Sequence, residues 1–81
     1  IEELDLGNNY IKKIPKTIKK LKKLKVLYLC ENQINKIPKN ICELNKLKYL
    51  YLHGNNLIKI PIELSYLKKL KILTLNNITL Y

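Results

Sequence analysis

The sequence predicts an α/β solenoid in which short parallel strands line one side and short helical segments return along the other. Two observations carry this prediction. Apolar residues recur every 23 residues along the whole chain, and the prolines Pro15, Pro38 and Pro61 fall at the same place in successive copies. A constant interval of about 20–50 residues is typical of stacked repeats. The expected copies, which together form a single domain 1–81, are residues 1–23, 24–46, 47–69 and a partial copy 70–81.

Each copy opens with the pattern L-x-L, which predicts a short strand. Leu4 and Leu6 alternate with Glu3 and Asp5, so the leucines face one side of the strand and the acidic residues face the other. No single copy can bury its leucines alone. We therefore expect the copies to stack with their strands parallel, so that the leucines merge into one core.

The second half of each copy changes its apolar spacing to about three residues. In the first copy Ile11, Ile14, Ile18 and Leu21 follow this spacing, which suits a 3₁₀ or short helical return. Pro15 marks the boundary, because proline lacks a backbone N–H but tolerates the first turn of a helix.

One asparagine follows each predicted strand, at Asn9, Asn32 and Asn55. The chain must turn inward at these points, and an asparagine amide offers both donors and acceptors for the backbone groups buried by such a turn. We therefore interpret these three asparagines as structural.

Written out, each copy reads L-x-x-L-x-L-x-x-N-x-I-x-x-I-P-x-x-I-x-x-L-x-x. This pattern resembles the leucine-rich repeat family, in the 23-residue form seen in intracellular Ras-suppressor-type and some bacterial and viral repeat proteins. The resemblance implies a right-handed arc with a parallel sheet on the concave face and 3₁₀ or short helices on the convex side. It also implies that Asn9, Asn32 and Asn55 form a ladder between neighbouring repeats.

The resemblance further implies a protein-binding module whose variable strand residues face the concave sheet. Tyrosine supplies a large contact area at low entropic cost, and four aromatic side chains should gather on neighbouring strands roughly 5 Å apart. The alternative is that the tyrosines simply stack as cross-strand neighbours. The residues expected to bind a partner are Tyr28, Tyr49, Tyr51, His53, Asp5, Glu31 and Thr74.

The formal net charge is +10, and all 16 basic residues are lysines. Many of them precede the strands, as Lys22, Lys23 and Lys25 do, and form a ridge that a polyanion can bind through counterion release. Arginine forks that read bases are missing, so specific nucleic-acid recognition is not expected. Two interpretations of the lysine ridge stay open. It is either a solvated edge, or a surface that binds nucleic acid or an anionic membrane nonspecifically.

Little in the sequence points to catalysis. Ser65 is the sole serine, and His53 with Cys30 is too sparse a set for a metal site or a nucleophile–base pair. We therefore expect a non-enzymatic module that needs no metal or cofactor. The alternative is the recognition segment of a larger enzyme or effector.

Compartment and assembly rest on weaker signals. Cys30 and Cys42 fall on opposite sides of one copy, which predicts free thiols and an intracellular, reducing compartment. No apolar run reaches the ~18 residues of a membrane span, and no signal peptide is visible. Asn77 lies in a glycosylation sequon that we interpret as a chance occurrence. The asparagine ladder stops at Ile78, so we expect either further repeats in a longer parent protein or self-association through an uncapped end of the solenoid, above all the C-terminal end.

Overall fold

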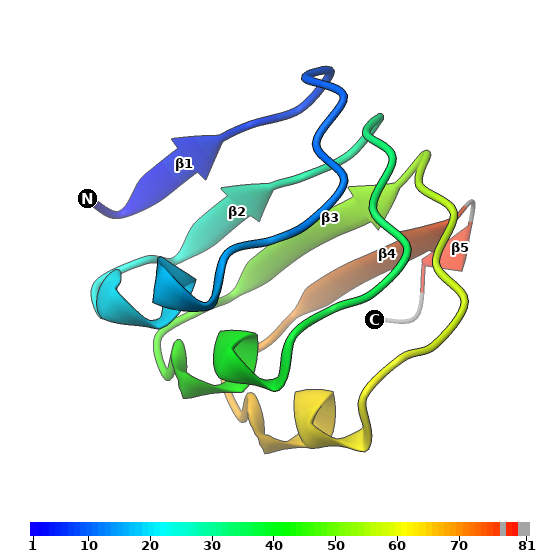
Figure 1. The fold of residues 1–81 in the computed structure, drawn as a ribbon. Coiled ribbons are helices and arrows are strands. Elements are labelled where there is room, and N and C mark those ends of the chain that lie inside the picture. The colour runs from blue at the N-terminus through cyan, green and yellow to red at the C-terminus, as the bar shows by residue number, and fades with distance from the viewer. Residues whose placement is uncertain (77, 80–81) are drawn as a thin grey trace.

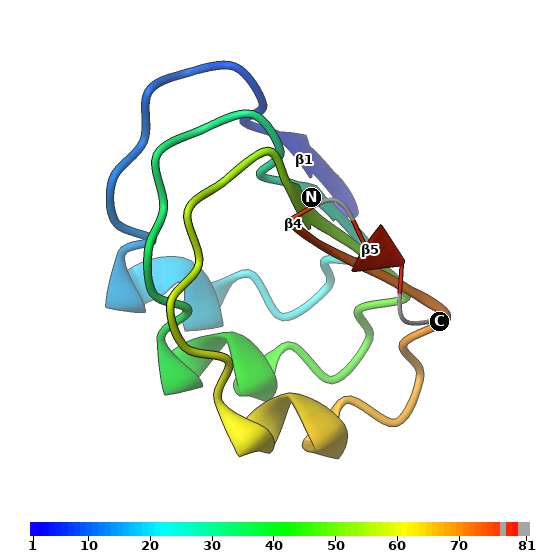
Figure 2. The ribbon, with the colours of Figure 1, turned by 90° about the vertical axis from the view of Figure 1, so that its right-hand side faces the viewer.

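The computed structural model describes residues 1–76 and 78–79, which form a five-stranded sheet and three short 3₁₀ helices (Figure 1). The strands are β1 (Glu3–Asp5), β2 (Val26–Tyr28), β3 (Tyr49–His53), β4 (Ile72–Asn76) and β5 (Ile78–Thr79). The helices are η1 (Lys16–Lys20), η2 (Lys39–Glu43) and η3 (Ile62–Tyr66). Figure 2 shows the sheet along one side and the helical returns along the other. The predicted α/β solenoid is confirmed.

The first four strands pair in parallel at the repeat interval. Leu27 of β2 is the register partner of Leu4 on β1 and of Leu50 on β3, and Leu50 is in turn the partner of Leu73 on β4. Each leucine of the L-x-L pattern therefore stacks on its counterparts in the adjacent copies. A slip of one residue would turn the whole set of leucines toward solvent, so burial of this face fixes the register.

Each 3₁₀ helix begins directly after a proline. Pro15 has φ −67° and ψ 146°, an extended conformation that its ring favours, and its carbonyl accepts a hydrogen bond from the Ile18 N–H at 3.1 Å. The helix ends where the Leu21 N–H donates to the Ile18 carbonyl, also at 3.1 Å. The same arrangement recurs after Pro38 and Pro61, so the prolines mark the start of each return as predicted.

Burial is deepest in the middle of the stack. Leu27 is fully buried, whereas its counterpart Leu4 in the first copy is only partly buried. At the other end Ile60 is 44% exposed, although its counterpart Ile37 is 6% exposed. Both differences have one cause: each side chain in the middle is covered by a copy on either side, and those at the ends are covered on one side only.

Strand β5 has no counterpart in the sequence prediction. It pairs antiparallel with β4, with Thr74 opposite Thr79 and Leu75 opposite Ile78. Ile78 stands where the repeat places its turn asparagine, and an isoleucine side chain cannot satisfy the backbone of that inward turn. The chain instead reverses along the edge of the sheet. The expectation for the Asn77 sequon lies outside the described residues.

Candidate functional site

The outward side chains of the first four strands form the surface that carries the predicted binding residues. Burial alternates along β3, where Leu50 and Leu52 are buried and Tyr49, Tyr51 and His53 are half-buried, as expected for a sheet with one face in the core. We call the outward surface, with two residues that follow β2, the sheet face. Its members are Glu3, Asp5, Val26, Tyr28, Cys30, Glu31, Tyr49, Tyr51, His53, Ile72 and Thr74.

The parallel register arranges these side chains in rows across the sheet. One row runs from β1 to β4 through Asp5, Tyr28, Tyr51 and Thr74. Tyr49 belongs to the preceding row, where its register partners are Val26 and Ile72. The structure thus brings Tyr28 and Tyr51 together and leaves Tyr49 beside aliphatic neighbours.

The rings of Tyr28 and Tyr51 are stacked. Their centroids lie 4.9 Å apart and their planes differ by 7°. This separation equals the spacing between neighbouring strands, about 4.7–4.9 Å, so the rings stand upright on the sheet with their planes across the row. An aromatic pair of this kind stabilises the sheet by about 0.5–1.5 kcal/mol beyond area burial. One face of each ring is used in the stack, and the opposite face of Tyr28 is turned toward β1.

Beyond this stack, His53 and Thr74 form a polar contact. The Tyr51 and His53 rings meet edge to face, with centroids 6.4 Å apart. The Thr74 Oγ1 atom accepts a hydrogen bond from the Leu52 backbone N–H at 3.1 Å and lies 2.8 Å from His53 Nδ1. The Thr74 hydroxyl can donate its own proton or accept a second hydrogen bond, so it can pair with His53 Nδ1 in either role.

At the other end of the row, Asp5 closes the turn after β1. Its Oδ1 atom accepts a hydrogen bond from the Gly7 N–H at 3.0 Å, and the Asn9 side chain donates to the Gly7 carbonyl at 3.1 Å. A β-carbon at Gly7 would lie 3.3 Å from Asp5 Oδ1 and 3.4 Å from Cys30 Sγ. Asp5, Gly7 and Cys30 therefore form one tightly packed corner of the sheet face.

The residue before each turn asparagine has a left-handed backbone. Asn8 has φ 59°, Glu31 has φ 55° and Gly54 has φ 72°. The Glu31 carboxylate lies against Gly54, since a β-carbon there would come within 2.6 Å of it. These left-handed positions were not predicted from the sequence. The presence of Asn and Gly at two of the three positions was the signal, because both residue types tolerate positive φ.

Two ionisable groups of the sheet face have shifted pKa values. Partial burial raises the pKa of Tyr28, and the negative charges of Glu3 and Asp5 raise it further. Burial also raises the pKa of the Cys30 thiol, with a smaller contribution from Asp5 and Glu31. Cys30 is therefore protonated at neutral pH and is a weak nucleophile.

Two of the three repeat asparagines bridge neighbouring copies. Asn32 Oδ1 accepts from the backbone N–H groups of Asn9 at 2.8 Å and Ile11 at 2.9 Å, and its Nδ2 donates to the carbonyls of Leu6 and Leu29. Asn55 repeats the pattern one copy later, for example by accepting from the Ile34 N–H at 2.9 Å.

Asn9 differs from the other two asparagines. Its side chain is exposed and, among the residues that the structure describes, bonds to the Gly7 carbonyl of its own turn rather than to a neighbouring copy. The reason is geometric: each bridging asparagine reaches back to the preceding copy, and no described copy precedes the first.

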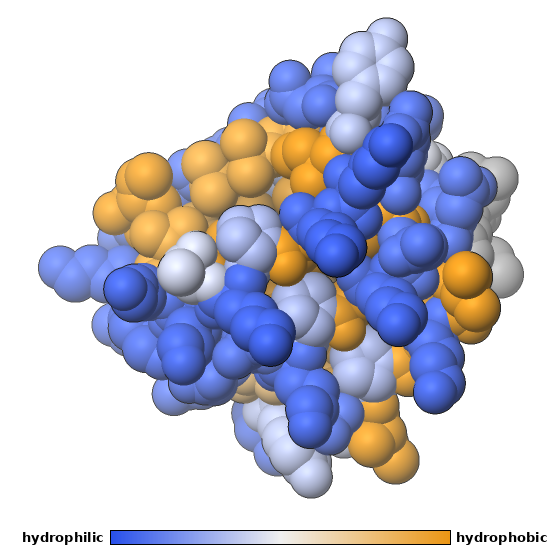
Figure 3. Space-filling view, in the orientation of Figure 1, coloured by the Kyte–Doolittle hydropathy of each residue, from blue (hydrophilic) through white to orange (hydrophobic). Residues whose placement is uncertain are grey.

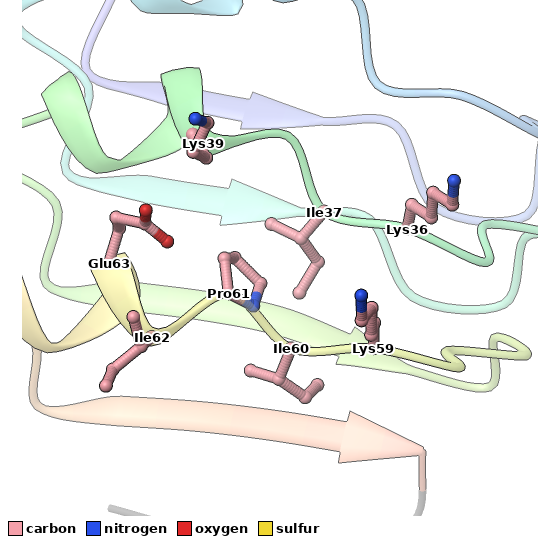
Figure 4. Close-up of a pocket in the computed structure, with 8 residues that line it drawn as sticks. All are labelled: Lys36, Ile37, Lys39, Lys59, Ile60, Pro61, Ile62 and Glu63. Carbon is pink, nitrogen blue, oxygen red and sulfur yellow. The ribbon is translucent and has the colours of Figure 1, made fainter.

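The return side carries two hollows at the junctions between neighbouring copies. The hollow in Figure 4 has a volume of about 380 Å³, and Ile37 on one return points toward Pro61 on the next. A second hollow of about 310 Å³ lies one copy earlier and has the equivalent residues Ile14 and Pro38 in its wall. Their linings contain lysines and aliphatic residues but no histidine, cysteine or serine. These hollows follow from the stacking of the copies and offer no reactive group pair.

The first copy leaves part of the apolar core open. In Figure 3 hydrophobic side chains gather along β1, beside a surface that is otherwise largely hydrophilic. A hollow of about 290 Å³ lies there, lined among others by Leu4, Leu6, Ile11 and Leu21. These four residues are the half-buried members of the core at its N-terminal end.

Within residues 1–76 and 78–79 no group of three or more His, Cys, Asp or Glu side chains is placed to hold a metal ion. Over the same residues, no helix combines the length and the apolar character that crossing a lipid bilayer requires.

Parallel strands in a 23-residue register, 3₁₀ returns and buried bridging asparagines define a strand-and-return repeat solenoid. Comparison with known proteins agrees. The leucine rich repeat family matches over residues 1–57 and again over residues 24–80. The chain belongs to the leucine-rich repeat family, whose members generally serve as protein-interaction modules.

A solved structure extends this comparison. A leucine-rich repeat protein of Leptospira interrogans superimposes with a TM-score of 0.80 at 39% sequence identity. The match covers 83% of this chain but 17% of the Leptospira chain, so this chain spans a small part of that relative's length. A search of curated proteins gave no match.

Proposed function

We propose that this chain is a non-enzymatic protein-interaction module that binds its partner through the sheet face. One observation carries the proposal: Tyr28 and Tyr51 are held in a fixed stack on the side of the sheet that the core does not use. Rigid aromatic side chains lose little entropy on binding and are enriched at the centres of interfaces. The contact of His53 with Thr74 adds polar groups of fixed orientation beside the stack.

The alternation along each strand supports this choice of surface. Leu27 and Leu29 are at most 1% exposed, whereas Tyr28 between them is half-buried on the other side. A partner on the sheet face therefore contacts side chains that can change without opening the core. The hollows of the return side lack this property, because Ile37 and Ile14 in their walls belong to the core.

The test compares two pairs of Tyr→Ala substitutions. Peptides are selected from a random display library against the parent chain, and their affinities are measured by isothermal titration calorimetry. Tyr28→Ala with Tyr51→Ala should weaken the selected peptides by about tenfold or more, as removal of interface anchors does. Tyr10 and Tyr66 lie off the sheet face and are 80% and 65% exposed, so Tyr10→Ala with Tyr66→Ala is the matched control.

Circular dichroism first establishes that both double variants are folded. Equal affinity of the selected peptides for both would place their binding elsewhere and contradict the proposal. Equal affinity of both variants for acidic peptides, lost in 0.5 M salt, would favour the lysine ridge and hence the polyanion alternative.

Two finer points rest on the same reasoning. The chain spans only part of its Leptospira relative, so we propose that it works as the recognition part of a longer protein. Cys30 and Cys42 are both free thiols, and we propose a reducing, intracellular compartment for it.

A further inference from the structure

The charges of this chain are sharply divided between its surfaces. All 16 basic residues are lysines, and none occupies a sheet-face position. Three of the chain's six acidic residues, Glu3, Asp5 and Glu31, do occupy that face. The Asp, Glu and Lys side chains that a partner meets on the sheet face are therefore all carboxylates, although the whole chain carries a net charge of +10.

The aromatic stack lies next to these carboxylates in a defined order. Asp5 is the register partner of Tyr28, and Tyr28 that of Tyr51. Because Tyr51 on β3 stacks on one face of the Tyr28 ring, the opposite face of that ring lies on the side of β1. Burial raises the pKa of the Tyr28 hydroxyl, and the negative charge of Glu3, with a smaller contribution from Asp5, raises it further.

This order suits one kind of side chain. A guanidinium is a flat cation that stacks on an aromatic face and bonds a carboxylate with two parallel N–H groups. The upright ring of Tyr28 supplies the face. Asp5 supplies a carboxylate whose Oδ1 atom already accepts from Gly7, and Glu3 in the preceding row supplies a second. An ammonium group gains from the charges but has no flat surface to place against the ring.

We propose that the sheet face binds a basic peptide segment of its partner, with an arginine side chain seated against the free face of the Tyr28 ring and paired with Asp5 and Glu3. The inference rests on the proposed function, because it names the partner chemistry for the same surface. A second copy of this chain is a weaker occupant than an arginine-containing partner, since the chain contains lysine but no arginine.

The experiment uses three synthetic Gly/Ser nonapeptides that carry two arginines, two lysines or two glutamates at the same places. Each is titrated into the ¹⁵N-labelled chain at low salt, and amide shifts report both site and affinity. The arginine peptide should shift the amides of Asp5, Tyr28 and Tyr51 and bind at least about threefold more tightly than the lysine peptide. The glutamate peptide should leave these amides unmoved.

Matched variants separate charge from aromatic stacking. Glu3→Gln with Asp5→Asn should weaken the arginine peptide by about tenfold, because two carboxylate partners are lost. The asparagine keeps the oxygen that accepts from Gly7, so the turn is preserved. Glu43→Gln with Glu63→Gln removes the same charge from η2 and η3 and should leave the affinity unchanged.

At the ring, Tyr28→Phe keeps the aromatic face and should keep affinity, whereas Tyr28→Leu should lose most of it. Equal binding of the arginine and lysine peptides, or equal effects of the two carboxylate variants, would overturn the inference. If peptides selected from the display library depend on Tyr28 and Tyr51 but contain no basic residue, the inference fails and the proposed function stands. If no peptide depends on these tyrosines, both fail.

Discussion

The substitution Asn32→Ala should destabilise the fold far more than the same substitution at Asn9. Asn32 is 7% exposed and accepts hydrogen bonds from the N–H groups of Asn9 and Ile11 while donating to three carbonyls. Asn9 is exposed and its side chain makes one bond, to Gly7. The two positions occupy the same place in the repeat, so the comparison isolates the bridge between copies.

The expected size follows from these contacts. A buried backbone group left without a partner costs about 1–3 kcal/mol. The bond from Asn32 to the Leu29 carbonyl is buried, and the bonds from the Asn9 and Ile11 N–H groups are partly buried, so these groups share the loss. We expect a loss of about 2–3 kcal/mol in the free energy of unfolding for Asn32→Ala. For Asn9→Ala we expect at most about 0.5 kcal/mol, as for other surface substitutions.

Urea denaturation followed by circular dichroism measures both variants. The midpoint should fall for Asn32→Ala while the slope with urea stays the same, since the folded structure is kept. In thermal unfolding, each kcal/mol should lower Tm by about 4–8 °C in a domain of this size, so Asn32→Ala should lower it by roughly 8–24 °C. Free energies for the two variants within about 0.5 kcal/mol of each other would refute the bridging role.

Four further outcomes are expected. Leu50→Ala should cost about 2–5 kcal/mol in urea denaturation by opening a cavity at the fully buried centre of the stack. Glu31→Asn should instead raise the free energy of unfolding by roughly 0.5–1 kcal/mol, because asparagine tolerates the φ of 55° better. Burial raises the pKa of Cys30, so its alkylation by iodoacetamide should be slow at pH 7 and accelerate only above the ordinary thiol pKa; fast reaction at neutral pH would contradict this. Ile62 on η3 is 80% exposed, and the equivalent residues of the two earlier copies are lysines. We therefore expect the chain to self-associate through the C-terminal end of the solenoid, and Ile62→Lys to shift the sedimentation equilibrium toward monomer.

The fold was predictable from the sequence because every copy repeats the same pattern of leucines and prolines. The leucine columns determine the register, as the pairing of Leu27 with Leu4 and Leu50 shows, and the prolines determine where each return begins. These features depend on periodicity and on the fixed φ of proline, both of which can be read from a single chain.

The parts that escaped prediction depend on the absence of a neighbour or on side-chain orientation. The exposure of Asn9 depends on the direction in which the asparagines reach, and neither that nor the reversal into β5 is visible in the repeat pattern. At the candidate site, the sequence predicted that Tyr28 and Tyr51 would be adjacent. It did not predict that the rings stack with planes 7° apart, because ring orientation depends on packing across strands rather than on spacing along one.

Along each strand, inward side chains form the core and outward side chains form the sheet face, so the two groups differ in how freely they can be substituted. Most sheet-face side chains, such as Tyr28, contribute to the outer surface without closing the core, so they can vary with the partner at small cost to the fold. Asp5 and Thr74 are different, because Asp5 accepts from the Gly7 N–H and Thr74 accepts from the Leu52 N–H. These two residues lie at opposite ends of the same row, on either side of the tyrosine stack. Substitutions of the tyrosines at the centre of the row should therefore change partner binding with little effect on the fold, whereas substitutions of Asp5 or Thr74 at its ends should affect both.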